Sequence, residues 1–269
     1  MTRPEEWAPD GIDLRRPSAA RVYDYFLGGA HNFAVDRELA EQIAAMTPNI
    51  GQTMRSNRAF LRRAVRFLTD NGVRQFLDVG SGIPTVGNVH EVAQSAAPDA
   101  KVIYIDVDPV AVAHSEAILA GNDKTGVICA DLREPDRILA EAHKLGLFDF
   151  DQPVALLLAG ILHFVPDEDE PGAAVATLTA ALTPGSYLLI SHATGDGQPA
   201  EVIEAQSLSS RTATQIILRP RAQIEAYFRG FTLVDPGLVF IPSWRPEPGE
   251  PVEEHPERVG AYAGVGRKD

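Results

Sequence analysis

The stretch Arg74-Gln75-Phe76-Leu77-Asp78-Val79-Gly80-Ser81-Gly82 decides the fold. A short apolar run ends in an acid and two glycines, which is typical of a buried strand that leads into a tight loop and a helix. Glycine lets the backbone approach a ligand closely, and the N-terminus of the following helix offers free N–H groups. The stretch therefore predicts a ligand-binding loop at the end of a strand in an α/β sheet.

The acid before the first glycine, Asp78, limits which ligand this loop can hold. A nicotinamide dinucleotide would place a pyrophosphate against the loop, and a carboxylate beside it would repel that group. S-adenosylmethionine carries an amino acid head and a sulfonium, so the same carboxylate would face a cation. Asp78 and the absence of a glycine at Thr85 both disfavour a nicotinamide-dependent oxidoreductase, which stays an alternative.

From Arg74 onward, short apolar runs alternate with helical patterns, which indicates βαβ units and a mostly parallel sheet covered on both faces. Strands are expected near 76–79, 101–106, 126–130, 154–160 and 187–192. Helices are expected at 86–96, 110–120, 135–144, 172–182 and 220–228. Two last apolar runs, 230–241 and 260–265, are joined by a loop rich in proline and glutamate and suggest a closing antiparallel hairpin.

Composition limits the class of protein. The chain has 269 residues, 45% of them hydrophobic, which is enough for one sizeable core. Its net charge of −13 gives a field that repels nucleic acid and anionic membrane surfaces, so neither is expected as a partner. No segment has the pattern of a signal peptide or a membrane span, and a cytoplasmic protein is expected.

Several conspicuous residues have structural interpretations. The arginine stripe before the glycine loop is expected to form the solvated face of a helix; it consists of Arg55, Arg58, Arg62, Arg63 and Arg66. The single cysteine, Cys129, lies in the apolar run 126–130 and is expected to be buried in a strand. Trp244 is expected to pack over the terminal hairpin. The histidines lack partnering acids at metal-ligand spacing, so no metal site is predicted.

Two more acids stand at the ends of predicted strands. The second strand ends at Asp106, where the ribose hydroxyls of an adenosine would lie. Val107 follows it, and Asp108 is expected to cap the next helix, which begins with a proline. The third strand leads into Asp131 and Leu132: an acid that can accept the exocyclic amine of adenine, and a leucine that can lie against its ring. These positions predict an adenosine site at the carboxyl edge of the sheet.

These motifs resemble those of the class I S-adenosylmethionine-dependent methyltransferases, from about Arg74 to the end of the chain. The resemblance implies a Rossmann-like α/β fold with a mainly parallel seven-stranded sheet, a terminal antiparallel hairpin and S-adenosyl-L-methionine as cofactor. The residues that it places against the cofactor are Asp78, Gly80, Ser81, Gly82, Asp106, Val107, Asp131 and Leu132. The first acid and the glycines would hold the methionine part, the second acid the ribose and the third the adenine. Pro84 stands where the family often has a third glycine, which makes the loop more rigid.

An N-terminal block, 1–72, precedes the cofactor-binding part, 73–269, although one structural domain is expected overall. A narrower resemblance, to an actinobacterial group of predicted methyltransferases, rests on Arg21-Val-Tyr-Asp-Tyr-Phe-Leu-Gly-Gly-Ala-His-Asn-Phe33, Asn57-Arg58-Ala-Phe-Leu61 and Val234-Asp-Pro-Gly-Leu238. The block is expected to be a helical cap. One interpretation makes it a lid over the cofactor, and the other makes its aromatic side chains simply core.

In the lid interpretation, Tyr23 and Asn32 would cover the cofactor, and Arg21 would pair with the methionine carboxylate. His163 follows the fourth strand, where its imidazole could remove a proton from an acceptor or only shape the loop. Methyl transfer from a sulfonium depends mainly on alignment, so a base is not required.

The expected activity is in-line methyl transfer from S-adenosylmethionine to a small-molecule oxygen, nitrogen or carbon nucleophile. The alternative is a non-catalytic, regulatory protein that binds S-adenosylmethionine or S-adenosylhomocysteine. The sequence indicates neither the acceptor nor the oligomeric state.

Overall fold

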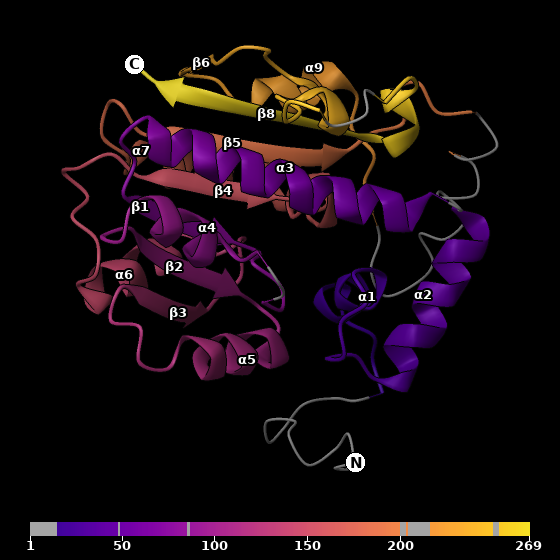
Figure 1. Cartoon of the computed structure of the whole chain (residues 1–269), viewed down its shortest axis with the longest axis horizontal. Coiled ribbons are helices and arrows are strands. Elements are labelled where there is room, and N and C mark those ends of the chain that lie inside the picture. Colours follow the sequence, from indigo (N-terminus) through magenta and orange to yellow (C-terminus); the bar gives the residue numbers. More distant parts are fainter. Residues whose placement is uncertain (1–14, 48, 85–86, 200–202, 204–215, 250–252) are drawn as a thin grey trace.

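The computed structural model describes residues 15–47, 49–84, 87–199, 203, 216–249 and 253–269. Its eight-stranded sheet has the order β3-β2-β1-β4-β5-β8-β6, with β7 paired to β8 (Figure 1). The parallel strands are β1 (Gln75–Val79), β2 (Lys101–Asp106), β3 (Thr125–Cys129), β4 (Ala155–Ala159) and β5 (Tyr187–Ala193). The strands of the antiparallel end are β6 (Phe231–Leu233), β7 (Val239–Phe240) and β8 (Ala261–Lys268).

The parallel strands are apolar because helices cover both faces of the sheet. Every residue of β1 is buried, and its side chains alternate between two cores: Phe76 faces one, and Leu77 and Val79 face the other. Asp78 shares the side of Phe76, so a carboxyl group stands at the carboxyl end of the central strand, on the face of the first core.

Two groups of helices form the outer layers (Figure 1). The first core includes residues of α3 (Ile50–Asp70) and α4 (Val89–Ala96), together with Leu119 at the end of α5 (Pro109–Leu119). The second core includes residues of the helices on the opposite face, which are α6 (Pro135–Leu145), α7 (Pro171–Ala180) and α9 (Arg221–Ala226). Short 3-10 turns at Leu162–Phe164, Asp167–Asp169, Ile241–Ser243 and Pro256–Val259 complete the elements of the described part.

The described part of the N-terminal block is mainly helical, as predicted, and its helices pack in two different places. The long helix α3 belongs to the main core, because Phe60, Leu61, Ala64, Val65 and Leu68 form an apolar stripe that is buried against the sheet. Helices α1 (Ala19–Phe26) and α2 (Ala34–Met46) pack on each other through a small cluster of their own. They lie beyond the carboxyl ends of the parallel strands (Figure 1).

The predicted order of elements is confirmed, and the five parallel strands fall close to their expected positions. Asp108 caps α5 as predicted, with its Oδ1 accepting a hydrogen bond of 2.9 Å from Val110 N–H. The terminal pairing is antiparallel, with eight strands rather than seven. The turn at Asp235-Pro236-Gly237 divides the run 230–241 into β6 and β7, and both pair with β8.

Two of the single-residue expectations have opposite outcomes. Trp244 is fully buried in the core that also includes residues of β8, with Val239 of β7 packed against it, as expected for packing over the terminal hairpin. Its ring lies edge-on against Phe60 and Phe67 of α3. The prediction that Cys129 is buried is wrong, because this residue ends β3, the edge strand of the sheet, and is exposed. An edge strand has a neighbour on one side only, so an apolar run does not guarantee burial there.

The prediction of a fully solvated arginine stripe is also wrong in part. Residues Arg55, Arg62 and Arg66 are exposed, whereas Arg58 and Arg63 are half-buried. The helical repeat explains why Arg58 is covered: Leu61 and Val65 follow it by three and seven residues, and both belong to the buried face of α3.

Within the described ranges, no helix is long and apolar enough to cross a bilayer. The same ranges contain no cluster of three or more His, Cys, Asp or Glu residues arranged to hold a metal ion.

Candidate active site

The loop after β1 has the backbone conformation that its glycines predict. Gly80 and Gly82 have φ angles of +74° and +67°, which side-chain-bearing residues rarely adopt. The N–H groups of Gly80 and Ser81 donate hydrogen bonds of 2.8 and 3.0 Å to the carbonyl of Ile105 in β2. A Cβ on Gly80 would stand 2.6 Å from the side chain of Ile161, so no larger residue fits there without a shift.

At the tip of β2, Asp106 holds this loop in place. Its Oδ2 accepts a hydrogen bond of 2.7 Å from Gly82 N–H, and its Oδ1 accepts one of 2.8 Å from Asp108 N–H. The residue is 8% exposed, and burial raises the pKa of its carboxyl to about 6, although these two donors work in the opposite direction. The carboxyl group predicted to meet the ribose therefore also fixes the glycine loop.

Asp78 is buried more deeply, at 4% exposure. Burial raises the pKa of its carboxyl to about 7, and the neighbouring charge of Asp106 adds to this, whereas the positive charge of Arg58 lowers the pKa. A buried carboxylate of this kind needs a cation to be stable in its charged form. In the described part of the chain, the nearby cation that acts on its titration is Arg58.

A cavity of about 200 Å³ opens where the carboxyl ends of four parallel strands meet. Its walls include Gly80 and Asp106 from the first two strand ends, and Asp131 and Leu132 from the third. The loop after β4 closes the other side with apolar side chains, which are Ile161, Phe164 and Val165. Val107, also in the wall, is 59% exposed, which is unusual for valine and leaves its side chain available to a ligand.

The cavity is thus mainly apolar with carboxylates at its rim, an arrangement suited to a flat ring with polar edges. One of these rim acids, Asp131, is already paired with Arg133, whose NH2 and Nε lie 2.6 and 3.0 Å from its Oδ2. Partial burial works to raise the pKa of Asp131, but the hydrogen bonds from Arg133 outweigh it, and the pKa lies below its usual value. Asp131 is therefore an anion at neutral pH.

A series of hydrogen bonds that begins at Tyr23 connects the N-terminal cap with the core. The Tyr23 hydroxyl donates to the carbonyl of Met54 at 3.1 Å and accepts from Nδ2 of Asn57 at 3.2 Å. The Oδ1 of Asn57 in turn accepts a hydrogen bond of 2.6 Å from the hydroxyl of Ser191 in β5. These hydrogen bonds place Tyr23 near the carboxyl end of β5 and outside the wall of the cavity.

Arg58 follows Asn57 on α3 and lies on the same side of the site. Its guanidinium carbon is 5.7 Å from the centroid of the Tyr23 ring, and its Nε is buried without a hydrogen-bond partner among the described residues. Ser81 Oγ, in the glycine loop, is likewise buried and lacks a partner in that part of the chain. Sequence reasoning missed both Asn57 and Arg58 as site residues. The helical spacing of Arg58 relative to Leu61 was the signal available.

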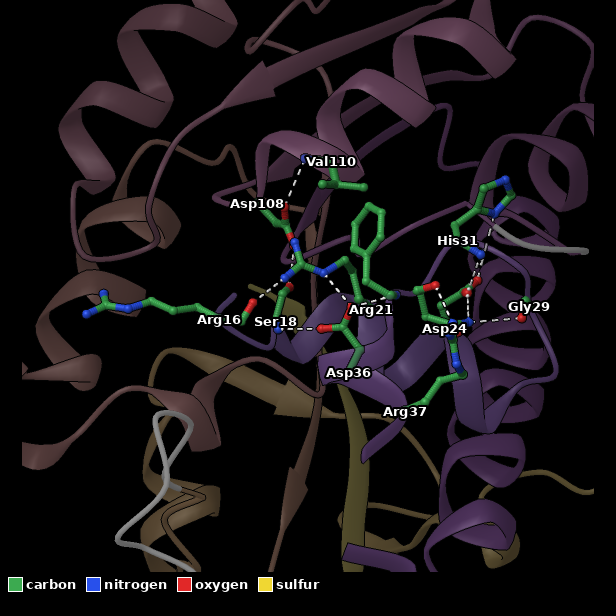
Figure 2. A network of polar contacts seen from close by, with 12 residues as sticks. Arg16, Ser18, Arg21, Asp24, Gly29, His31, Asp36, Arg37, Asp108 and Val110 are labelled. Carbon is green, nitrogen blue, oxygen red and sulfur yellow. Dashed lines mark hydrogen bonds and ion pairs between the residues drawn. The ribbon is translucent and has the colours of Figure 1, made fainter. Parts of the chain in front are cut away.

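Arg21, predicted to meet the methionine carboxylate, is engaged inside the cap instead (Figure 2). Its Nε lies 2.9 Å from Oδ2 of Asp36, and its NH2 donates to the carbonyl of Arg16 at 2.6 Å. Its NH1 is 3.5 Å from Oδ2 of Asp108, which also accepts a hydrogen bond from the hydroxyl of Ser18. These contacts tie α1 and α2 to the start of α5, two residues beyond the Asp106 carboxyl.

Asn32, predicted to cover the cofactor, also lies in this network. Its Nδ2 donates to Oδ2 of Asp24 at 2.9 Å and to the carbonyl of Gly29 at 3.0 Å. The neighbouring His31 N–H donates to the same Asp24 oxygen at 2.9 Å (Figure 2). Asn32 therefore organises the turn between α1 and α2, and neither it nor Arg21 lines the cavity.

His163 lies in the turn after β4, next to the end of β5. Its Nδ1 accepts a long hydrogen bond of 3.4 Å from Ala193 N–H, and its ring centroid is 5.6 Å from that of His192. Burial, followed by the charges of His192 and Arg219, holds the pKa of His163 well below its usual value. The ring is therefore neutral at physiological pH, with its proton assigned to Nε2 by the Ala193 contact.

A buried arginine fixes the turn that carries His163. Arg219 is 2% exposed and donates to the carbonyls of Leu162 and Val165 at 2.9 and 2.8 Å. It also contacts Nε2 of His192 at 3.0 Å and Oδ1 of Asp167 at 2.6 Å. Sequence reasoning missed this residue, because nothing in its local sequence shows that its partners lie 27 to 57 residues earlier.

The donor set fits the cofactor that the sequence predicts. A buried acid near the glycine loop suits an ammonium group, an acid at the tip of β2 suits a diol, and the apolar cavity suits a purine. The buried Nε of Arg58 and the Ser81 hydroxyl, both without partners in the described part, mark a polar ligand on the same side.

Comparison with known proteins also indicates a methyltransferase that uses S-adenosylmethionine. The profile of the S-adenosyl methyltransferase family matches residues 5–269. A crystal structure of a candidate methyltransferase from Thermobifida fusca YX is 40% identical, with a TM-score of 0.91, and the match covers 98% of this chain and 99% of that chain. A DUF574 family protein from Streptomyces avermitilis MA-4680 is 36% identical, with a TM-score of 0.90 and coverages of 96% and 99%.

A more distant structure shares the fold alone. The N-methyltransferase NodS from Bradyrhizobium japonicum WM9, solved with S-adenosyl-L-homocysteine, is 14% identical, with a TM-score of 0.50, and the match covers 80% of this chain and 87% of that chain. The search of curated proteins gave no match. The chain belongs to the S-adenosyl methyltransferase family, and it is a methyltransferase that uses S-adenosyl-L-methionine as its cofactor.

Proposed function

We propose that this methyltransferase binds S-adenosylmethionine along the carboxyl ends of β1, β2 and β3 and transfers its methyl group to a small-molecule oxygen, nitrogen or carbon nucleophile. The observation that carries the proposal is the placement of three acids at the carboxyl ends of neighbouring strands: Asp78 lies in β1, Asp106 ends β2, and Asp131 follows β3. The two that flank the glycine loop are buried.

The adenosine part fits the cavity. Asp106 would accept the ribose hydroxyls, and its buried position makes such hydrogen bonds strong. Val107 and Leu132 would contact the faces of the adenine ring. Asp131 would accept a hydrogen bond from its exocyclic amine. The exposed side chain of Val107 supports this assignment, since contact with a ring would bury it.

The methionine part fits the space by the glycine loop. Asp78 would face the ammonium group, while Gly80, Ser81 and Gly82 would let the ligand approach the backbone. Tyr23, which reaches this side of the site from α1, would cover the amino acid head and limit the access of water.

When bound, S-adenosylmethionine supplies a methyl group on a sulfonium, already activated for displacement. The protein then has to orient the acceptor, and His163 is the side chain proposed to contact it. A neutral ring that keeps a proton on Nε2 would donate a hydrogen bond to the acceptor rather than remove its proton. The acceptor proton would leave to water.

The small size of the acceptor is inferred from charge. The net charge of −13 opposes binding of nucleic acid, whose affinity depends on neutralised phosphates. In a cavity bordered by carboxylates, a neutral or cationic acceptor meets less repulsion than an anionic polymer.

Binding is tested first, by calorimetric titration of the full chain with S-adenosylhomocysteine and with NAD. The proposal expects a single site for S-adenosylhomocysteine and no heat from NAD. An Asp106→Ala variant should bind roughly 10- to 100-fold more weakly, the effect of losing a charged hydrogen-bond acceptor. Asp151→Ala is the matched control, because Asp151 is exposed and remote from the cavity. Unchanged affinity in a folded Asp106 variant would remove the ribose assignment.

The acceptor class is tested by incubation with S-adenosylmethionine labelled in its methyl group. A panel of small phenols, amines and carbon acids is compared with bulk RNA, DNA and protein. The proposal expects label in a small product together with release of S-adenosylhomocysteine. Label in the polymer fraction alone would contradict it.

A further inference from the structure

We propose that Arg58 binds the carboxylate of the cofactor's methionine part, so that Arg58 and Asp78 together hold the two opposite charges of one amino acid head. This inference rests on the proposed function and adds a binding residue that is absent from the set predicted from the sequence to contact the cofactor.

The position of Arg58 follows from its neighbour on α3. Asn57 bridges Tyr23 and Ser191 with hydrogen bonds of 3.2 and 2.6 Å, which fixes this turn of the helix over the carboxyl end of β5. A Cβ on Gly160, at the end of β4, would stand 3.3 Å from Nδ2 of Asn57, so helix and sheet approach closely here. Arg58 comes next on the helix and lies 5.7 Å above the Tyr23 ring.

The hydrogen-bonding state of Arg58 indicates a missing partner. Its Nε is buried and has no acceptor in the described part of the chain, and no carboxylate of that part forms an ion pair with it. A buried guanidinium donor without an acceptor is unfavourable and uncommon in native proteins. The ligand group that matches the planar fork of a guanidinium best is a carboxylate or a phosphate.

Asp78 decides between these two anions. Arg58 is close enough to Asp78 for its charge to lower the pKa of that buried carboxyl. A phosphate drawn to Arg58 would carry its negative charge into the field of Asp78, whereas an amino acid head also brings an ammonium group. A zwitterion therefore satisfies both side chains, and a phosphate satisfies one.

The other arginines of the cap and of α3 are less suited to this role. The guanidinium of Arg21 is occupied by Asp36 and the carbonyl of Arg16. Arg63 donates to the carbonyls of Trp244 and Ile241. Arg55 is exposed, which makes it a matched control on the same helix.

The test compares three ligands by calorimetry with the full chain. S-adenosylhomocysteine carries both charges, its decarboxylated analogue keeps only the amine, and 5′-methylthioadenosine has neither. In the Arg58→Ala variant, affinity for S-adenosylhomocysteine should fall roughly 10- to 100-fold, the effect of losing a charge-assisted pair. Affinity for the other two ligands should change by less than about twofold, within the range of a distant substitution. The control Arg55→Ala should change none of the three.

Two results would overturn the inference. Equal losses for all three ligands would mean that Arg58 only supports the structure, and an unchanged affinity for S-adenosylhomocysteine would mean that it does not touch the ligand. Arg58→Gln, which keeps Cβ, Cγ and Cδ of the side chain but removes its charge, gives the same comparison if the alanine variant unfolds. Failure of the proposed function has a different signature, because the wild-type protein would then bind neither S-adenosylhomocysteine nor 5′-methylthioadenosine.

Discussion

The Asp106 carboxylate accepts a hydrogen bond of 2.7 Å from Gly82 N–H, which joins the tip of β2 to the glycine loop after β1. Its other oxygen accepts a hydrogen bond from Asp108 N–H. Asp108 is the N-cap residue of α5, and its side chain also accepts a hydrogen bond from Ser18 of the N-terminal block. One buried side chain thus connects the glycine loop, α5 and the N-terminal cap. The group proposed to recognise the ribose also preorganises the loop that surrounds it.

Replacing Asp106 with asparagine should therefore lower stability as well as affinity. An amide has one acceptor oxygen, so either Gly82 N–H or Asp108 N–H would face an NH₂ group and lose its bond. The expected loss in the free energy of unfolding is about 1–3 kcal/mol, the effect of one buried unsatisfied donor. Urea denaturation without ligand measures it, with Asp151→Asn as the exposed control. Wild-type stability in the Asp106 variant would contradict the structural role of this carboxylate.

Asp78 should lower the stability of the ligand-free protein above neutral pH. Burial raises the pKa of its carboxyl to about 7, so the native state keeps a proton that the unfolded chain releases near pH 4. Its contribution to stability therefore falls as the pH rises from about 4 to 7, and stays low above that. Asp78→Asn should raise the free energy of unfolding at pH 8 by on the order of 2 kcal/mol, with a smaller gain at pH 5. Denaturant titrations at the two pH values measure the difference, and a gain independent of pH would contradict the assignment.

Cofactor affinity should depend on pH in the opposite sense. The ammonium group proposed to face Asp78 needs a charged carboxylate, so binding below a pKa of about 7 must release a proton. The apparent affinity for S-adenosylhomocysteine should rise roughly tenfold per pH unit well below that pKa and level off above it. Calorimetry in buffers of different ionisation heat counts the released protons. The Asp78→Asn variant should bind weakly and show little of this dependence; proton release that persists unchanged would point to another group.

The fold could be predicted because its signals are local. The run before Asp78 is apolar since β1 is covered on both faces, and Asp108-Pro109 is a cap sequence that works within one helical turn. The position of a strand at the edge of the sheet could not be predicted from its own residues. The run ending at Cys129 has the pattern of a central strand, but β3 has a neighbour on one side only. The extra strand β7 depended in the same way on pairing with β8, more than twenty residues later.

The charged part of the site was harder to predict, because each arginine is defined by partners distant in sequence. Arg21 was predicted to meet the methionine carboxylate, but it pairs with Asp36 of the next helix, 15 residues later. Arg58 belongs to the arginine stripe that was predicted to be exposed to solvent, although the helical repeat places it beside the buried Leu61. For Arg219, no periodicity connects the residue with the turn after β4 that it fixes.

Removal of Arg219 should destabilise the protein and loosen the turn that carries His163. Arg219→Ala leaves the carbonyls of Leu162 and Val165 without their donor and opens a cavity where a large side chain was buried. The expected loss in the free energy of unfolding is about 2–4 kcal/mol. Arg221→Ala serves as control, since Arg221 is exposed and its side chain makes a weak ion pair with Glu225, 3.9 Å away. Equal effects of the two substitutions would show that the buried contacts of Arg219 contribute nothing.

His163 should stay neutral across the physiological range, and NMR can observe this before an acceptor is known. Burial and the charges of His192 and Arg219 hold the pKa of the His163 ring well below its usual value, and burial lowers the pKa of His192 to about 4. The ring signal that disappears in a His163→Asn variant should therefore not shift between about pH 6 and 8. Its nitrogen shifts should show an unprotonated Nδ1 and a protonated Nε2, the tautomer set by the Ala193 contact. A midpoint inside that range would mean that the ring gains a proton near neutral pH, and would restore His163 as a candidate base for proton removal from the acceptor.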